Sequence, residues 1–228
     1  MIVDERMVTY INSLDKGNTR FLNNLEQEAL KNHVPIIRRE MQSFLKVLLQ
    51  IKAPARILEV GTAVGFSTLF MCTYSPQNCE IVTIENYEKR IPVALENFKR
   101  AGKAEQITLL PGDAQEVLKT LKEPFDFIFM DAAKGQYIHF FPEVMRLLKT
   151  GGILVSDNVL QDGDLIESHF AVERRNRTIY KRMREYLYVL KHHEELETSV
   201  LPLGDGVTVS VKKAKEADRE RAGENYGS

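Results

Sequence analysis

The sequence predicts an α/β fold with a mostly parallel, seven-stranded sheet, a C-terminal antiparallel hairpin and helices on both faces. From residue 56 onward, short apolar runs alternate with helical segments, a pattern typical of a parallel sheet. The last two apolar runs instead flank Gly204-Asp205-Gly206, a turn signal that predicts an antiparallel hairpin at the sheet edge. The length of 228 residues suits one domain with a sizeable core.

The expected elements follow from these patterns in chain order. Five apolar runs predict the parallel strands, at residues 57–60, 80–84, 107–110, 125–130 and 152–156. The connecting helices are expected at residues 67–73, 88–100, 114–121 and 140–148. A long helix is expected over residues 165–190, and the hairpin strands over residues 198–201 and 207–211.

The two ends of the chain differ from this alternating region. Residues 1–54 are expected to be helical and to pack on the core, because Phe44, Leu45, Leu48 and Leu49 recur at helical spacing before Pro54 ends the pattern. Residues 55–212 form the expected main domain. Residues 213–228 are charged and poor in apolar side chains, which favours a solvated, disordered tail.

The overall composition excludes a general attraction to polyanions. The net charge is −1, so a nucleic acid or an acidic membrane could be bound only by a local patch. Cys72 and Cys79 follow no metal or redox spacing, which favours reduced thiols. The sequence shows neither a signal peptide nor an apolar run of about 20 residues, so a cytoplasmic protein is expected.

Oxygen-bearing side chains follow two of the predicted strands. Asp131 comes directly after residues 125–130, and Asp157 and Asn158 come directly after residues 152–156. The carboxyl ends of strands are where open α/β sheets bind ligands, and two carboxylates with an amide carbonyl suit a hard cation such as Mg²⁺. Lys134 stands three residues after the first acid, where it could act on a bound substrate. The alternative is that each acid only caps the next helix.

A glycine-rich loop follows the first predicted strand. Its pattern, Glu59-x-Gly61-x-x-x-Gly65, differs from the G-x-G-x-x-G of dinucleotide-binding proteins. Glu85 ends the second strand, where an acid can hold both ribose hydroxyls, and Asp113 follows the third, where it can reach an adenine amino group. These features fit a nucleoside without a pyrophosphate, such as S-adenosylmethionine, rather than NAD.

The sequence resembles the metal-dependent O-methyltransferases, the family that includes catechol and caffeoyl-CoA O-methyltransferases. The resemblance covers about residues 33–211. Its motifs are Leu58-Glu-Val-Gly-Thr-Ala-Val-Gly-Phe-Ser67, Thr83-Ile-Glu85, Gly112-Asp-Ala114, Phe129-Met-Asp-Ala-Ala-Lys134 and Ser156-Asp-Asn-Val159. The resemblance implies a Rossmann-like methyltransferase fold, S-adenosylmethionine as cofactor and Mg²⁺ or a similar cation as metal.

The resemblance also implies roles for individual residues. The positions matching cofactor contacts are Ile37, Glu59, Gly61, Ser67, Glu85, Asp113, Ala114 and Asp131. Asp131, Asp157 and Asn158 match the metal ligands. Lys134 matches the catalytic lysine, with Asp131 beside it in the catalytic group. The expected reaction is an in-line displacement, in which a substrate hydroxyl loses its proton to Lys134 and attacks the cofactor methyl group. The alternative for Lys134 is a simple ion pair with Asp131.

Within the family, the chain is most similar to bacterial tRNA 5-hydroxyuridine methyltransferases. The segments that carry this similarity are His33-Val-Pro-Ile-Ile37, Asp131-Ala-Ala-Lys-Gly-Gln-Tyr137, Asp157-Asn-Val-Leu160 and Pro202-Leu-Gly-Asp-Gly206. The similarity implies methylation of the 5-hydroxyl of wobble 5-hydroxyuridine to 5-methoxyuridine, with the tRNA anticodon stem-loop as partner. Members of the family are often dimers, which implies a homodimer.

A run of basic residues favours an RNA substrate. It comprises Arg174, Arg175, Arg177, Lys181, Arg182 and Arg184, with no acid between the first and the last. On a helix these residues lie opposite the apolar face, and a phosphate backbone is a natural partner for them. The alternative is a solvated helix surface.

Three other functions are weighed against tRNA methylation. Methylation of small catechol-like phenols is less favoured because the chain has no Trp, whereas catechol enzymes clamp their ring with tryptophans. A catalytically weak RNA-binding module is less favoured because the ligand set and Lys134 are intact. A nicotinamide dehydrogenase is excluded by the glycine spacing.

Overall fold

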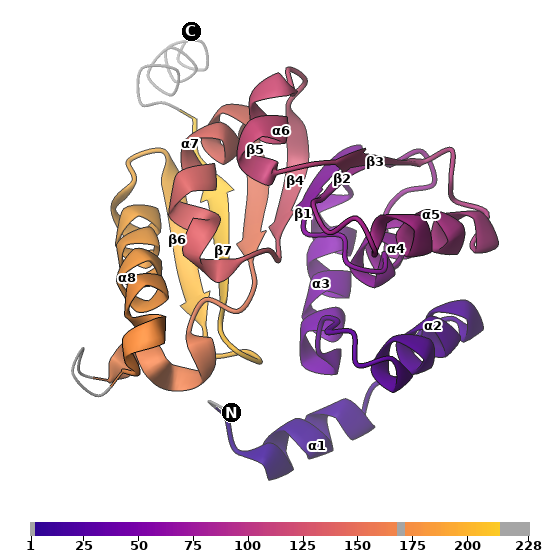
Figure 1. The fold of residues 1–228 in the computed structure, drawn as a ribbon, viewed down its shortest axis with the longest axis horizontal. Coiled ribbons are helices and arrows are strands. Elements are labelled where there is room, and N and C mark those ends of the chain that lie inside the picture. Colours follow the sequence, from indigo (N-terminus) through magenta and orange to yellow (C-terminus); the bar gives the residue numbers. More distant parts are fainter. Residues whose placement is uncertain (1–2, 168–171, 215–228) are drawn as a thin grey trace, which may run out of the picture.

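The protein is described from a computed structural model, in which residues 3–167 and 172–214 are placed (Figure 1). A single sheet runs through this part of the chain. Its strands are β1 (Arg56–Val60), β2 (Glu80–Glu85), β3 (Ile107–Pro111), β4 (Phe125–Met130), β5 (Leu148–Ser156), β6 (Leu196–Leu201) and β7 (Val207–Lys212). They lie in the order β3-β2-β1-β4-β5-β7-β6.

The strand directions confirm the predicted fold class. The neighbours from β3 to β5 pair in parallel, whereas β7 runs antiparallel to both β5 and β6. After β1 the chain moves outward to β2 and β3, then returns to place β4 on the other side of β1. The strand order therefore reverses between β1 and β4, and the carboxyl ends of strands at such a point are the usual ligand site of an open α/β sheet.

Helices cover both faces of the sheet (Figure 1). They are α1 (Glu5–Ser13), α2 (Arg20–Lys31), α3 (Arg39–Lys52), α4 (Phe66–Tyr74), α5 (Ile91–Arg100), α6 (Ala114–Thr120), α7 (Tyr137–Leu147) and α8 (Arg177–His192). Short 3₁₀ turns are η1 (Lys134–Gln136), η2 (Gln161–Ile166) and η3 (Arg174–Asn176). Two hydrophobic clusters result, one beneath α6, α7 and α8 and the other beneath α2 to α5.

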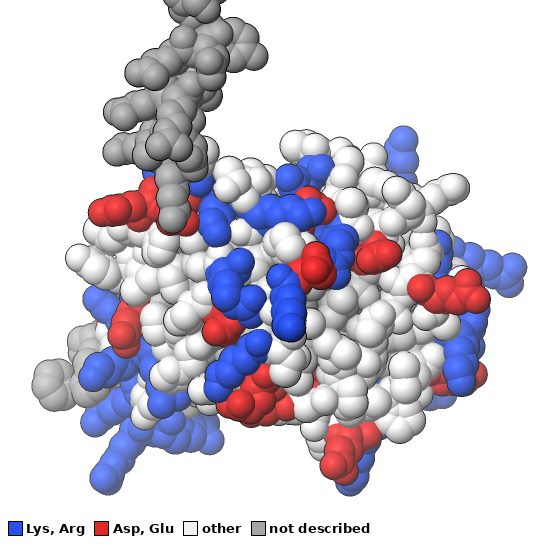
Figure 2. Space-filling model, turned by 90° about the horizontal axis from the view of Figure 1, so that it is seen from above, with Lys and Arg blue, Asp and Glu red and all other residues white. Residues whose placement is uncertain are grey.

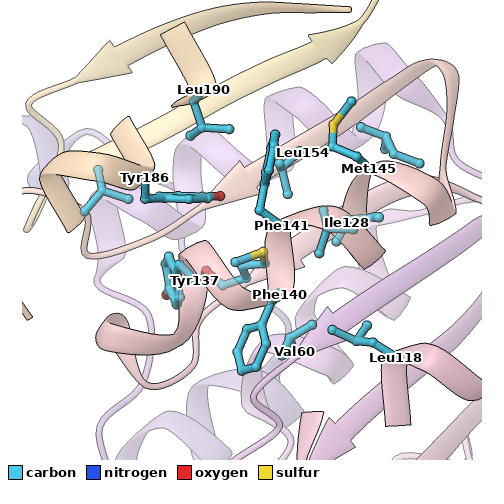
Figure 3. Close-up of a cluster of buried hydrophobic side chains, with 14 of the residues drawn as sticks. Val60, Leu118, Ile128, Tyr137, Phe140, Phe141, Met145, Leu154, Tyr186 and Leu190 are labelled. Carbon is cyan, nitrogen blue, oxygen red and sulfur yellow. Dashed lines mark hydrogen bonds between the residues drawn. The ribbon is translucent and has the colours of Figure 1, made fainter. Parts of the chain in front are cut away.

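Alternation along the strands divides side chains between the two clusters. In β1, Leu58 and Val60 join the cluster under α6 to α8, whereas Ile57 joins the cluster on the opposite face. Figure 3 shows the first cluster, in which Tyr137 and Tyr186 meet edge to face with ring centroids 5.5 Å apart. This contact fixes the start of α7 against α8, and the start of α7 lies next to the carboxyl end of β4.

The prediction of one long helix over residues 165–190 was wrong in its first part. Helix α8 begins only at Arg177, after η2 and η3, and residues 168–171 lie outside the described part of the chain. The apolar repeat explains the difference, because its first member is Ile179. Upstream of that residue there is no continuous apolar stripe to hold a helix on the core.

The N-terminal helices precede the alternating strands and helices in the sequence, and α2 and α3 pack in the hydrophobic cluster on one face of the sheet. Leu25 of α2 and Leu45 of α3 are buried in the same cluster as Phe70 of α4. Helix α1 is different: it has no buried residue, and in Figure 1 it lies apart from the sheet. Residues 215–228, where the tail was expected, lie outside the described part of the chain. Among the described residues no helix is both long and apolar enough to cross a membrane.

Candidate active site

A cavity of about 780 Å³ opens at the carboxyl ends of β1, β2, β4 and β5, where the strand order reverses. Its volume is typical of a site for a cofactor and a small substrate group. Ten of the residues predicted from the sequence line it: Ile37, Gly61, Ser67, Glu85, Asp113, Ala114, Asp131, Lys134, Asp157 and Asn158. Residues from separate strands thus meet at one place.

Gly61 allows the loop after β1 to lie directly on the end of β4. Its φ is +104°, and a Cβ added there would stand 2.1 Å from the carbonyl oxygen of Asp131. No other residue fits without moving one of these two segments. The same close approach brings the glycine-rich loop and the Asp131 carboxylate to one wall of the cavity.

Two acids are held at the predicted ribose and adenine positions by backbone donors. The Glu85 carboxylate accepts hydrogen bonds from the N–H of Ala63 at 2.7 Å and of Tyr87 at 2.8 Å. Asp113 caps α6 and accepts from the N–H of Gln115 at 2.7 Å. Both side chains face the cavity with lone pairs left for hydroxyl or amino donors of a ligand.

Glu59 lies behind the cavity wall rather than in it. It points from β1 toward α4, has no exposed surface, and accepts hydrogen bonds from Ser67 and Thr83, both at 2.5 Å, and from Thr68. Burial raises the pKa of Glu59 to about 7, against the three hydroxyls that lower it. Its expected cofactor contact stays a prediction. Ser67, which donates a hydrogen bond to Glu59, does line the cavity.

Replacing Glu59 with Gln should remove a pH dependence of stability. The pKa of Glu59 rises from about 4.5 to about 7 in the folded protein, so ionising Glu59 costs more there than in the unfolded chain. The wild-type free energy of unfolding should therefore fall between pH 5 and pH 8, by up to about 3 kcal/mol from this residue. Urea denaturation of both proteins without cofactor checks this. Glu59→Gln should show a shallower fall, and identical pH slopes would contradict the assignment.

Asp131, Asp157 and Asn158 converge at the ends of β4 and β5. The Asn158 side-chain amide donates to Asp131 Oδ1 at 2.9 Å, and the Asn158 backbone N–H donates to Asp157 Oδ1 at 2.7 Å. Asn158 has a φ of +61°, a left-handed conformation that Asn tolerates better than most residues. The sharp turn after β5 thus directs both side chains back toward Asp131.

The electrostatics of this group fit a bound cation. Burial and, to a lesser extent, the neighbouring Asp131 carboxylate together raise the pKa of Asp157 to about 7; burial also raises the pKa of Asp131. Two carboxylates side by side and largely away from water are unfavourable unless a positive charge joins them. The described residues contain no cluster of three His, Cys, Asp or Glu side chains suited to a metal. Beside the two carboxylates, the third donor would therefore be the side-chain carbonyl oxygen of Asn158. Such an all-oxygen set fits Mg²⁺.

Tyr137 holds this group in place, a role that was not predicted from the sequence. Its buried hydroxyl lies 3.1 Å from the carbonyl oxygens of both Met130 and Asp157, and it accepts from the N–H of Ala132 at 3.2 Å. The ends of β4 and β5 are therefore tied through one phenol. A tyrosine at the start of the helix after Asp131 was the available signal, but its partners could not be read from spacing.

Lys134 lies on η1 and lines the cavity beside the two carboxylates. Its ammonium lowers the pKa of both Asp131 and Asp157, against the larger effect of burial. Because the Lys134 ammonium acts on the Asp131 carboxylate through its charge, the alternative of a lysine that only pairs with Asp131 stays open. Its amine is available to a substrate hydroxyl held near the carboxylates.

The hairpin turn between β6 and β7 completes the mouth of the cavity. Arg38, just before α3, pairs with Asp205 at 2.7 Å, and both line the cavity. Gly206 packs so closely on Leu160 that an added Cβ would stand 2.3 Å from its Cγ. The backbone N–H of Leu160 also donates to the Asp205 carbonyl at 2.8 Å. The turn is thereby fixed to the loop that carries Asp157 and Asn158, a relation that was not predicted from the sequence.

The basic residues are less uniform than predicted. Arg174 and Arg175 precede α8 in η3, so the six do not share one helix face, and Arg175 pairs with Glu173 at 2.7 Å. Arg177 and Arg182 are half-buried, and Arg182 donates to the Gly135 carbonyl at 3.1 Å. Lys181 and Arg184 are exposed. Figure 2 shows Lys and Arg side chains gathered at the lower left, on the side that α8 occupies in Figure 1.

The fold and the cavity together define a methyltransferase that depends on S-adenosylmethionine. The sequence matches the O-methyltransferase family over residues 12–213. The chain belongs to this family.

Individual relatives agree with the family match. A catechol O-methyltransferase of Niastella koreensis is 38% identical over 130 residues, which cover 55% of this chain and 59% of that relative. Caffeoyl-CoA O-methyltransferase 1 of Eucalyptus globulus is 31% identical over 176 residues, or 73% of this chain and 70% of the relative.

Solved structures give the same result. A Staphylococcus aureus protein assigned as a caffeoyl-CoA O-methyltransferase has a TM-score of 0.84 and 30% identity, covering 92% of this chain and 100% of its own. The S-adenosylhomocysteine-bound methyltransferase PaMTH1 of Podospora anserina has a TM-score of 0.82 and 27% identity, covering 92% and 95%. The family predicted from the sequence is confirmed, whereas the names of these relatives do not mention a tRNA substrate.

Proposed function

We propose that the protein is an Mg²⁺-dependent O-methyltransferase that converts wobble 5-hydroxyuridine in tRNA to 5-methoxyuridine. The observation that carries the methyl-transfer chemistry is the group of Asp131, Asp157 and Asn158 beside Lys134, in the cavity that also holds Glu85 and Asp113. Metal donors, base and nucleoside-binding acids therefore face one space. The proposal of an RNA substrate rests on the basic surface around α8, which consists of Arg174, Arg175, Arg177, Lys181, Arg182 and Arg184.

The residues divide the chemistry between binding and proton transfer. S-adenosylmethionine, when bound, supplies a methyl group on a sulfonium. Asp131, Asp157 and Asn158 would hold a divalent cation, which would supply Lewis-acid chemistry by lowering the pKa of a neighbouring substrate hydroxyl. Glu85 and Asp113 hold the nucleoside end of the cofactor. Lys134, in its neutral amine form, takes the hydroxyl proton as the new O–C bond forms and the bond between sulfur and the methyl group breaks, which releases S-adenosylhomocysteine. Alignment of oxygen, carbon and sulfur contributes ~7–11 kcal/mol in favourable cases.

The position of the basic surface supports RNA as the substrate. Arg182 of α8 contacts Gly135, the residue directly after Lys134. Cationic side chains therefore begin at the turn that carries the proposed base. The 5-hydroxyl and the adjacent 4-carbonyl of 5-hydroxyuridine supply two neighbouring oxygens, which suits the metal group as well as a catechol does. We infer that Arg174, Arg175, Arg177, Lys181, Arg182 and Arg184 contribute to binding the anticodon stem-loop.

Methylation of a small catechol-like phenol is the second candidate. It is favoured by the name of the Niastella koreensis relative and by the requirement of the metal group for adjacent oxygens. The same assay tests both candidates. The protein is incubated with labelled S-adenosylmethionine and Mg²⁺, and either with tRNA that lacks the methoxy group or with catechol, with an Asp157→Ala variant as the inactive control. Label on the tRNA is expected, and label on catechol alone would reject the tRNA proposal.

We also infer that the protein forms a homodimer through α1. Met7, Tyr10, Ile11 and Leu14 recur at helical spacing and are all more than half exposed, with Tyr10 at 66% and Leu14 at 65%. A second copy of the chain would cover this apolar stripe. A cytoplasmic location, where tRNA is available, is part of the same proposal.

Introducing charge into the apolar stripe should separate the dimer. Light scattering should give the wild type twice the 26.1 kDa mass of one chain, and an Ile11→Glu/Leu14→Glu variant the mass of one chain. Thr9→Glu, outside the stripe on the same helix, is the control and should stay dimeric. A wild type that already has the mass of one chain would reject the inference.

A further inference from the structure

We propose that a second depression, between α7 and α8, binds a backbone phosphate of the RNA substrate. The inference rests on the proposed function and adds a specific site to it. The depression has a volume of about 570 Å³ and is separate from the main cavity. Its charged and polar lining residues are His139, Arg177, Thr178, Lys181, Arg182 and Glu185.

The charge of the depression suits an anion. Three cationic side chains, Arg177, Lys181 and Arg182, face a single acid, Glu185. The chain as a whole has a net charge of −1, so positive charge is concentrated at this place. A phosphodiester carries one negative charge and oxygen acceptors, and arginine guanidinium groups match its geometry well.

Two of the cations are held in position before any ligand binds. Arg177 donates through Nε to the Val172 carbonyl at 3.2 Å, and Arg182 donates through Nη1 to the Gly135 carbonyl at 3.1 Å. Each guanidinium uses one of its five N–H groups in these contacts, and both side chains are half-buried. Side chains fixed in this way lose little freedom when they bind an anion. Lys181 is exposed and adds a mobile charge.

The depression lies behind the turn that carries Lys134. Gly135 packs on α8 so that an added Cβ would stand 3.5 Å from Ile179 Cγ1 and 3.9 Å from Arg182 Nη1. On the other side of the same turn, Lys134 and Gln136 line the main cavity. A nucleobase in the main cavity and a backbone phosphate of the same RNA strand in the depression would therefore lie on opposite sides of η1. Arg182 lines the depression and donates to the Gly135 carbonyl of this turn.

The remaining basic residues lie outside the depression. Arg175 is paired with Glu173, and Arg184 donates to the Leu165 carbonyl at 3.2 Å and to the Tyr180 hydroxyl at 2.7 Å. The basic residues therefore divide into the phosphate site, with Arg177, Lys181 and Arg182, and a surrounding surface. Charge changes within the site should affect RNA more than equal changes elsewhere on the protein.

Binding and kinetics test the site together. Fluorescence anisotropy measures the affinity for an anticodon stem-loop, and methyl transfer is measured with the stem-loop and with free 5-hydroxyuridine. Lys181→Ala should weaken stem-loop binding about tenfold at low salt and reduce the slope of log affinity against log salt by about one. Its KM for the stem-loop should rise more than its KM for the nucleoside. Glu185→Gln should strengthen stem-loop binding. Lys119→Ala removes an exposed lysine of α6 and serves as the control.

The outcomes for the site and for the proposed function differ. If Lys181→Ala and Glu185→Gln bind the stem-loop as Lys119→Ala does, the phosphate site is rejected, even when the wild type methylates the RNA. If the wild type binds the stem-loop in a Lys181-dependent way but methylates only catechol, the site stands and the tRNA methylation is rejected. Opposite changes in affinity for Lys181→Ala and Glu185→Gln would support the site.

Discussion

Asp157→Ala is expected to lower kcat by about three orders of magnitude, or ~4 kcal/mol of transition-state stabilisation, while the affinity for S-adenosylmethionine changes little. The reason is the position of Asp157 directly after β5, away from Glu85, which ends β2, and Asp113, which follows β3. Removing the Asp157 carboxylate removes one oxygen ligand of the cation but leaves the two acids that bind the nucleoside. Initial rates at saturating Mg²⁺ and calorimetric titration with S-adenosylhomocysteine measure the two effects.

The fold should survive this substitution. The backbone N–H of Asp157 donates to the Met130 carbonyl at 2.9 Å, and its own carbonyl accepts from Tyr137, and neither bond needs the carboxylate. Removing one of the two neighbouring carboxylates also relieves their repulsion. Asp157→Asn is the matched variant, because it keeps one oxygen donor and should regain part of the activity at raised Mg²⁺. A kcat of Asp157→Ala within tenfold of the wild type would contradict the metal role.

Lys134→Met is expected to lower kcat by roughly 10²- to 10⁴-fold, with a smaller effect on the KM for the substrate. The side chain lines the cavity near both carboxylates, so its loss removes the group that accepts the hydroxyl proton. The rate of the variant should rise steadily with pH, because solvent hydroxide replaces the missing base. Initial rates across a pH series measure this dependence.

Lys134→Arg decides between two roles of this residue. Arginine keeps the positive charge but does not lose its proton at ordinary pH, so it cannot act as a base. We predict that Lys134→Arg is about as inactive as Lys134→Met. Full activity of Lys134→Arg would show that the residue acts through its charge alone.

The strands could be predicted from the sequence because their burial follows local patterns. The run at residues 125–130 forms β4 with the predicted bounds, and β1, β2 and β3 differ from prediction by one residue at an end. The start of β5 was missed because Leu148 is followed by a polar pair and by Gly151 and Gly152, which resemble a turn. In the structure this stretch is an irregularity within the β4–β5 pairing. The prediction began helix α8 too early in the sequence. The residues before Ile179 lack an apolar stripe that would hold a helix on the core.

The site was predictable where a residue lies at the end of a strand or just after it. Asp131, Asp157, Glu85 and Asp113 meet at one sheet edge because parallel strands end together. Tyr137 was missed because its hydroxyl bonds depend on how α7 packs between two strand ends.

Other site features depend on contacts between distant parts of the chain. The Arg38–Asp205 pair joins residues far apart in sequence, so no local pattern indicates it. Glu59 shows the same limit, since its hydroxyl partners come from α4 and β2 and place it behind the cavity wall.

Nucleoside analysis of tRNA after reaction with metal-depleted protein tests the central claim most directly. The substrate is tRNA that carries 5-hydroxyuridine, incubated with S-adenosylmethionine and either a chelator or added Mg²⁺, and mass spectrometry measures 5-methoxyuridine. We predict 5-methoxyuridine only when Mg²⁺ is restored, and none with Asp157→Ala. Equal amounts of 5-methoxyuridine in chelator and in Mg²⁺ would contradict the metal-dependent mechanism.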